Sequence, residues 1–351
     1  MTLEELIARI TPPWETAREQ ARKRWDGLAK PLGSLGLLEE TVERIAALTG
    51  DPEVSAEDPA LLVFCADHGV VARGVSQTDS SVTAAVARAL GEGRSTVNPM
   101  ARAAGCRVIP VDMGIRDFPG APGVLDRRVR NGAGDITLGP AMTEEECRRA
   151  ILAGAELVFR EKDRGARLIL TGEMGIGNTT AASAMAAVLL DLTPEAVTGR
   201  GAGLSDLGLG RKRRAVETAL RVNRPDPRDP FSVLWKLGGL ELAAMCGAFL
   251  GGAAAKVPVV ADGFLSVLSA LCAVRMCPLA VHAVVPSHVS AEPAGQAVLE
   301  ALGLRAPIAA DMRLGEGTGA VCLLPLLRLA LAVYGSGQTF GALGIDAYTP
   351  Q

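Results

Sequence analysis

Residues 168–184 read LILTGEMGIGNTTAASA, and this stretch decides the fold class. An apolar run typical of a buried strand precedes a loop with Gly172, Gly175 and Gly177, and small residues typical of a helix follow. Strand, glycine loop and helix in that order favour an anion, because backbone N–H groups and the helix dipole both point at it. The loop has neither a P-loop lysine nor G-x-G-x-x-G spacing, and it carries an acid, Glu173. The stretch therefore predicts an anion site with a carboxylate inside it.

The alternation of strand and helix continues on both sides of this stretch. Apolar runs predict strands at 60–66, 107–111, 167–171, 257–261 and 280–285, and helical patterns predict helices at 81–90, 144–160, 179–190 and 239–255. Strands that are apolar throughout indicate a sheet covered on both faces. We therefore expect an α/β fold with a mostly parallel sheet and helices on both faces.

The two ends of the chain differ from its middle. Residues 3–50 and 319–334 give only helical patterns. We expect a small helical subdomain from residues 1–57 with 317–351, beside a large α/β domain of residues 58–316. The stretch RVNRPDPRDPFS (221–232) predicts a proline-rich surface loop.

Composition excludes several classes of protein. The chain has 351 residues, 48% of them apolar and only 3% aromatic, with 40 glycines and a formal net charge of −3, so nothing suggests a nucleic acid or an acidic membrane as partner. The start, MTLEELIARITPP, is acidic and amphipathic rather than a signal peptide, and the longest uncharged apolar run, 242–255, is too short to span a bilayer. Seven scattered cysteines without C-x-x-C spacing favour reduced, buried thiols in a soluble, cytoplasmic protein.

Polar residues follow all five predicted strands. In open parallel sheets ligands bind beyond the carboxyl ends of the strands, so these residues are expected to share a cleft. Each could instead cap the next helix, but five in register favour a carboxylate-rich cleft with glycine loops, suited to ribose hydroxyls and a phosphate. The residues are Asp67-His68-Gly69, Asp112-Met113-Gly114, Gly172-Glu173-Met174-Gly175, Asp262-Gly263-Phe264, and Ser287, His288, Ser290 and Glu292.

A second acid, Glu316, lies between two glycines in LGEGTGA (314–320). The glycines let the backbone approach a ligand, but the same pattern fits a tight turn with a solvated Glu316. The three histidines show no metal-ligand spacing, and His282 is expected in a strand as a core residue. Asp67-His68 could be an acid–base pair, although structural hydrogen bonds at a strand end are the preferred interpretation.

Taken in order, the motifs resemble one family. They are KPLGSLGLLE (30–39), DHGV (67–70), TGEMGIGNTT (171–180), TGRGAGL (198–204), PVVADGF (258–264), SHVSAEP (287–293) and LGEGTG (314–319). Together they are similar to the nicotinate-nucleotide–dimethylbenzimidazole phosphoribosyltransferases, which make the lower-ligand nucleotide of cobalamin. The resemblance implies a Rossmann-like large domain, a helical domain from both termini, a homodimer, and no metal or other cofactor.

The implied reaction moves 5-phosphoribosyl from nicotinate mononucleotide to a benzimidazole nitrogen, with inversion at the anomeric carbon. The family's base falls on Glu316, which would take the proton of the attacking heterocycle. Glu173 would stabilise the oxocarbenium-like state, and Asp262 would bind the ribose hydroxyls. The resemblance places the phosphate on Gly175 and Gly177.

Other positions follow from the same resemblance. Lys212, in GRKRR (210–214), matches a family lysine near the phosphate, although GRKRR alone would fit a solvated helix face. Ser290 and Gly319 are candidates for the nicotinate end. The remaining substrate-binding candidates are Gly172, Met174, Ile176, Asn178, Gly199, Arg200, Gly201, Gly263, Leu314, Ser80 and Ser81.

The sequence departs from the family at two places. Ala202 replaces a threonine in the GRGAG segment, and TDSS (78–81) stands where many members have a Tyr-Pro-Gln-Glu-like stretch near the acceptor. Another benzimidazole, a purine or a phenol therefore stays open as acceptor. The alternatives to a transferase are a nucleotide glycohydrolase, in which water replaces the heterocycle, and a nucleotide-binding subunit without activity.

Overall fold

A parallel sheet forms the centre of the protein in the computed structural model, which describes residues 1–348. Its strand order is β3-β2-β1-β4-β5-β6, and every neighbouring pair runs parallel. This confirms the α/β prediction. The strands are β1 (Ala60–Ala66), β2 (Arg107–Gly114), β3 (Leu125–Asp126), β4 (Ile169–Met174), β5 (Val259–Ala261) and β6 (Val284–Pro286).

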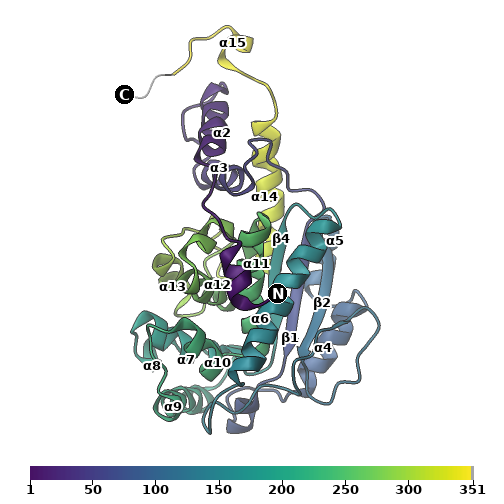
Figure 1. The fold of residues 1–351 in the computed structure, drawn as a ribbon, viewed down its shortest axis with the longest axis vertical. Helices are drawn as coiled ribbons and strands as arrows, with labels where there is room; N and C mark the ends of the chain where they lie inside the picture. The colour runs from purple at the N-terminus through teal and green to yellow at the C-terminus, as the bar shows by residue number, and fades with distance from the viewer. Residues whose placement is uncertain (349–351) are drawn as a thin grey trace.

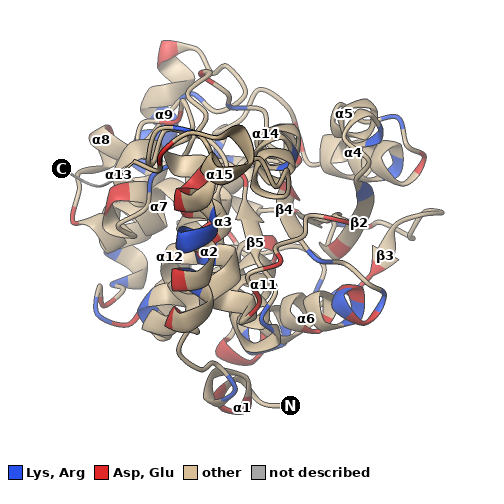
Figure 2. Ribbon diagram, turned by 90° about the horizontal axis from the view of Figure 1, so that it is seen from above, with Lys and Arg blue, Asp and Glu red and all other residues tan. Residues whose placement is uncertain are grey.

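Helices cover both faces of the sheet (Figure 2). Side chains of β1 alternate between two cores: Leu62 and Phe64 enter one, and Leu61 and Val63 enter the other. The first core is covered mainly by α1 (Leu3–Ala8), α6 (Glu144–Asp163), α7 (Asn178–Leu190), α9 (Asp206–Asn223), α10 (Pro230–Leu237), α11 (Leu240–Ala255), α12 (Phe264–Met276) and α13 (Gly295–Ala301). The second is covered mainly by α2 (Glu15–Gly27), α3 (Leu37–Thr49), α4 (Ser81–Gly91), α5 (Val97–Ala103) and α14 (Thr318–Tyr334). Lys, Arg, Asp and Glu stand mostly on the helices and loops around the sheet (Figure 2).

Helices from the two ends of the chain meet at one end of the molecule, where α2, α3 and α14 lie together (Figure 1). The rings of Trp25 and Tyr334 lie 4.8 Å apart, and Arg24 donates to the carbonyl of Tyr334. By contrast, α1 packs on α6 and α11. The division into two domains at residues 57 and 316 stays a prediction.

Two predicted segments were wrong in part. Residues Pro278–Ala283 form a 3₁₀ helix, so the strand predicted at 280–285 is reduced to β6, and half-buried His282 lies in that helix rather than in a strand. The loop predicted at 221–232 covers only 224–229. Helix α9 continues to Asn223, and Pro230 starts α10 because proline suits the first helical position.

The remaining short elements are the 3₁₀ helix Gly69–Arg73 and the helices α8 (Pro194–Val197) and α15 (Phe340–Leu343). All seven cysteines are unpaired, and all but Cys322 are buried. No helix within residues 1–348 is long and apolar enough to cross a membrane.

Candidate active site

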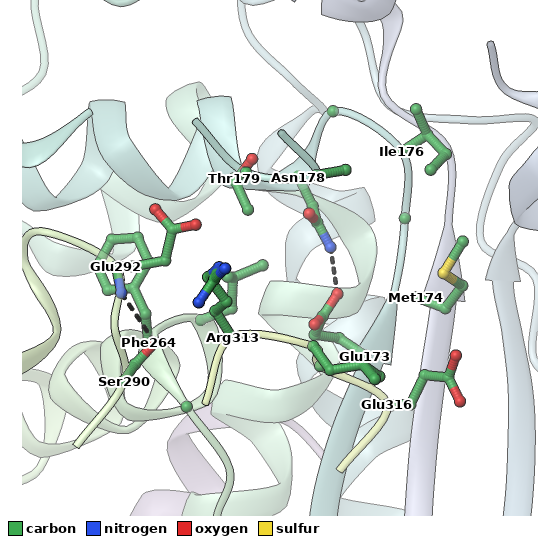
Figure 3. A pocket seen from close by; sticks show the side chains of 18 of the residues that line it. Glu173, Met174, Ile176, Asn178, Thr179, Phe264, Ser290, Glu292, Arg313 and Glu316 are labelled. Carbon is green, nitrogen blue, oxygen red and sulfur yellow. Dashed lines mark hydrogen bonds between the residues drawn. The ribbon is translucent and has the colours of Figure 1, made fainter. Parts of the chain in front are cut away.

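A cavity of about 180 Å³ opens beyond the carboxyl ends of β4 and β5. The strand order reverses direction between β1 and β4, and in open α/β sheets ligands bind in the crevice at such a point. The walls come from the glycine loop after β4, the ends of β5 and β6, and the segment before α14 (Figure 3). Three of the five polar strand ends singled out in the sequence therefore converge on one cavity, those after β4, β5 and β6. The prediction was wrong for Asp67-His68 after β1 and for Asp112 after β2, which do not line it.

The glycine loop passes tightly over β1. A Cβ on Gly175 would lie 2.5 Å from the carbonyl oxygen of Ala66, and one on Gly177 would lie 2.7 Å from Val71. Gly177 also has φ +94°, a conformation that favours glycine, and it caps the thirteen-residue α7. The two glycines thus bring the backbone before α7 to the wall of the cavity, beside Asn178 and Thr179 at the start of that helix.

Lys212 lies behind this loop and is fully buried. Its ammonium donates to Thr179 Oγ1 at 2.8 Å and to the carbonyl of Gly199 at 3.0 Å. Burial lowers the pKa of Lys212 to about 8, although the nearby charge of Glu292 acts in the opposite direction. The solvated basic face that GRKRR could have indicated is therefore wrong for Lys212, while its neighbours Arg211 and Arg214 are exposed.

Glu316 lies in a strained turn. Its φ is +58°, and the flanking Gly315 and Gly317 have φ of +90° and +86°. Asp262 holds this turn, because its two carboxylate oxygens accept from the N–H groups of Gly317 at 3.2 Å and Ala320 at 3.0 Å. Gly172 allows the turn to approach β4, since a Cβ there would lie 2.6 Å from the Glu316 carbonyl carbon.

The carboxylate of Glu316 is buried, with only 8% of the residue exposed, so the solvated alternative is wrong. Its Oε2 accepts from Ser95 Oγ at 2.6 Å and from the N–H of Val97 at 3.2 Å. No hydrogen bond within residues 1–348 engages Oε1. One oxygen is therefore fixed by donors, and the other is free to accept a proton.

Glu173 and Glu316 lie on adjacent segments, joined by a backbone hydrogen bond of 3.2 Å from Glu316 N to Glu173 O. Their side chains point in different directions, and that of Glu173 faces Asn178, which donates to it (Figure 3). Burial, followed by the charges of Asp262 and Glu241, raises the pKa of Glu173 to about 8. The raised pKa favours the protonated form of Glu173 near neutral pH.

His288 lines the cavity, and its hydrogen bonds define which ring nitrogen carries the proton. Ser287 Oγ donates its only proton to the carbonyl of Ala261 at 2.7 Å, so it accepts from His288 Nδ1 at 3.0 Å. Burial lowers the pKa of His288 and keeps the ring neutral. Its Nε2 is therefore a hydrogen-bond acceptor near Gly263.

Most candidates named from the sequence line this cavity: Glu173, Met174, Gly175, Ile176, Gly177, Asn178, Arg200, Gly201, Asp262, Gly263, Ser290, Leu314 and Glu316. Gly199 lines a second cavity of about 860 Å³ that shares Arg200 and Gly201 with the first. Gly172, Lys212, Gly319, Ser80 and Ser81 line neither. A Cβ on Gly319 would lie 2.0 Å from His288 Nδ1, and Ser81 is exposed.

Several lining residues escaped the sequence reasoning. Phe264, Glu292 and Arg313 face the cavity (Figure 3). Phe264 and Glu292 stand in segments already singled out as strand ends, whereas Arg313 directly precedes the LGEGTGA segment, and no pattern marked it.

Asp67 and His68 take part in separate structural contacts. Asp67 accepts from the N–H of Arg116 at 2.8 Å, and His68 Nε2 lies 2.6 Å from Glu241 Oε1 with both groups buried. The preferred interpretation of structural hydrogen bonds is confirmed. No cluster of three or more potential metal-ligating side chains occurs in the described part of the chain.

Known proteins resemble this chain over almost its whole length. A family model described as "Phosphoribosyltransferase" matches residues 10–345. The nicotinate-nucleotide–dimethylbenzimidazole phosphoribosyltransferase of Ruminiclostridium cellulolyticum is 41% identical over 350 residues, which cover 100% of this chain and 99% of that protein. The protein of the same name from Chlorobium chlorochromatii is 43% identical, with 98% of each chain covered. The crystal structure of CobT from Thermus thermophilus superposes with a TM-score of 0.89 at 44% identity, covering 95% of this chain and 100% of that one.

Proposed function

The chain belongs to the nicotinate-nucleotide–dimethylbenzimidazole phosphoribosyltransferase family, and from this premise we propose the reaction that it catalyses. The enzyme moves the 5-phosphoribosyl group of nicotinate mononucleotide to 5,6-dimethylbenzimidazole. The products are nicotinate and α-ribazole 5′-phosphate, a nucleotide of cobalamin. The observation that carries the proposal is the free oxygen of buried Glu316, which shares a cavity with a glycine loop suited to phosphate.

The phosphate of the donor binds at the start of α7, on the backbone of Gly175 and Gly177. Lys212 lies behind this loop, where its ammonium donates to Thr179 and to the carbonyl of Gly199, and its positive charge favours a phosphate on the loop. Arg200 and Gly201 complete this end of the cavity. At pH 7 Lys212 is protonated, because its pKa of about 8 lies above that pH.

Glu316 is the general base. As the acceptor nitrogen attacks the anomeric carbon, the bond to nicotinate breaks and its electron pair returns to the pyridine nitrogen, which becomes neutral. The proton of the benzimidazole N–H moves to Glu316 Oε1. Oε2 stays bonded to Ser95 and Val97, so the carboxylate needs no reorientation during the step.

Glu173 responds to the positive charge of the donor and of the oxocarbenium-like state. A cation beside a buried carboxyl lowers its pKa, so donor binding favours release of the Glu173 proton. The ionised carboxylate then stabilises the anomeric centre. Asn178 keeps it in place.

Asp262 holds the Glu316 turn and, with Gly263, borders the ribose. Ser290 and Gly319 lie toward the nicotinate end. Met174, Ile176 and Leu314 line the acceptor end, next to the segment with Ser80 and Ser81. Ile176 N donates to Thr83 Oγ1 at 3.1 Å, which joins the glycine loop to the helix that begins at Ser81.

The assembly is a homodimer in the cytoplasm, and residues 1–57 with 317–348 form its helical subdomain; residues 349–351 of the predicted subdomain lie outside the described part of the chain. Leu329 and Val333 on α14 are 65% and 39% exposed and support a partner on this apolar face. Seven unpaired cysteines support a reducing compartment.

The test is nicotinate release from nicotinate mononucleotide, measured with and without dimethylbenzimidazole. We expect release to require the acceptor and to match the α-ribazole 5′-phosphate formed. Release at the same rate without acceptor would instead identify a nucleotide glycohydrolase. A panel of benzimidazoles, purines and phenols then identifies the preferred acceptor.

A further inference from the structure

We propose that Ser95 is a positioning residue for Glu316, and that its hydroxyl holds the carboxylate in the orientation from which Oε1 takes the acceptor proton. The inference rests on the proposed function, because it assigns Ser95 a part in that reaction. Ser95 belongs to none of the motifs that mark the family resemblance. It lies in the connection between α4 and α5, 221 positions from Glu316 in the sequence.

The contact is short and buried on both sides. Ser95 Oγ lies 2.6 Å from Glu316 Oε2, and the two residues are 7% and 8% exposed. A hydroxyl that donates to an ionised carboxylate at this distance forms a charge-assisted hydrogen bond. The second donor to Oε2, the N–H of Val97, is longer at 3.2 Å. Ser95 is therefore the stronger of the two groups that orient the carboxylate.

The turn that carries Ser95 is itself fixed. Its N–H donates to Asn98 Oδ1 at 2.8 Å, and Asn98 Nδ2 donates in turn to the carbonyl of Leu90 at 3.3 Å. Asn98 is 5% exposed, so this small network is shielded from water. The position of the hydroxyl is thus set by α4 and α5, independently of the turn that carries Glu316.

The backbone and the side chain of Glu316 are consequently fixed from two sides. Asp262 holds the backbone of the turn through Gly317 and Ala320, whereas Ser95 and Val97 hold the carboxylate. Neither contact involves Oε1. Loss of the Ser95 hydroxyl leaves the backbone in place but lets the carboxylate rotate.

The test compares Ser95→Ala with Ser95→Thr, which keeps a hydroxyl, and with Thr96→Ala, which removes an exposed hydroxyl from the same turn. For Ser95→Ala we expect kcat to fall roughly 10- to 100-fold, as loss of one hydrogen bond to a charged group implies. KM for nicotinate mononucleotide should stay within about twofold, because the donor phosphate binds elsewhere. Ser95→Thr should recover most of the activity, and Thr96→Ala should match the unmodified enzyme.

A double variant separates positioning from a general loss of structure. If Ser95 acts through Glu316, then adding Ser95→Ala to Glu316→Gln costs no further activity. Additive losses, an unchanged kcat for Ser95→Ala, or a rise in KM alone would overturn the inference. If Ser95→Ala does not fold, Ser95→Thr decides the question, since the retained hydroxyl must then preserve both kcat and KM. If the unmodified enzyme forms no α-ribazole 5′-phosphate, the proposed function fails instead.

Discussion

Replacement of Glu173 by glutamine should make the stability of the protein less sensitive to pH. Burial and the neighbouring charges of Asp262 and Glu241 raise the pKa of Glu173 from 4.5 to about 8 in the folded protein. Between these two values an unfolded chain has lost the Glu173 proton, whereas the folded chain still holds it. The folded state then binds more protons than the unfolded state, so its stability falls as the pH rises.

The size of the effect follows from that difference. Each pH unit inside the window costs about 1.4 kcal/mol, so from about pH 5 to pH 7 the native protein loses roughly 2 to 3 kcal/mol through this group. Glutamine resembles the protonated side chain in size and carries no charge at any pH. The free energy of unfolding of Glu173→Gln should therefore gain that amount relative to the unmodified protein over the same interval.

Urea unfolding of both proteins at several pH values measures this difference. Glu161→Gln is the matched control. Burial acts to raise the pKa of Glu161, but hydrogen bonds from Arg107 and Arg160 and their charges outweigh it and lower the pKa. That carboxylate is ionised in both states above about pH 5, so its replacement should give no such slope. If the free energy of unfolding changes with pH by the same amount in Glu173→Gln and in the unmodified protein, the reasoning is refuted.

Two further predictions concern the phosphate end and the ring of His288. Lys212→Met should raise KM for nicotinate mononucleotide roughly 10- to 100-fold, because the positive charge behind the phosphate loop and its hydrogen bonds to Thr179 and Gly199 are lost. In the unmodified enzyme KM should rise above about pH 8, where Lys212 loses its proton. The control variant Arg214→Met, changed at an exposed position, should show the same KM and the same pH dependence as the unmodified enzyme in steady-state kinetics. Gly319→Ala should destabilise the protein by about 1–3 kcal/mol in urea unfolding, because its methyl group would lie 2.0 Å from His288 Nδ1. Gly341→Ala, with open space around it, is the control, and equal stability of the two variants would contradict the close packing.

The parallel sheet and five of its strands could be predicted because each has a continuous apolar run followed by a polar residue, whereas the two-residue β3 has no such run and was not predicted. Residues 60–66 match β1 from end to end. The prediction was weakest where an apolar stretch is not a strand. Pro278 starts a 3₁₀ helix that takes up most of the strand expected at 280–285, and apolar character alone does not distinguish the two.

The residues of the candidate site that belong to sequence motifs could be predicted. Glu173, Glu316 and Asp262 share one end of the sheet, as their positions after strands or between glycines indicated. The contact of Ser95 with Glu316 could not be predicted from the sequence, because it joins segments far apart in the chain. The raised pKa of Glu173 likewise depends on burial beside Asp262 and Glu241, which only the tertiary structure creates.

The central claim is that Glu316 takes the proton of the acceptor, and Glu316→Gln tests it most directly. The measurement is turnover to α-ribazole 5′-phosphate together with the Kd for nicotinate mononucleotide. Loss of a general base typically costs roughly 10²- to 10⁴-fold in kcat, and we predict a loss of that size with a nearly unchanged Kd. Glu173→Gln should lose less, because its role is electrostatic. Equal losses of binding and turnover in Glu316→Gln would mean that Glu316 is a structural residue and would contradict the account.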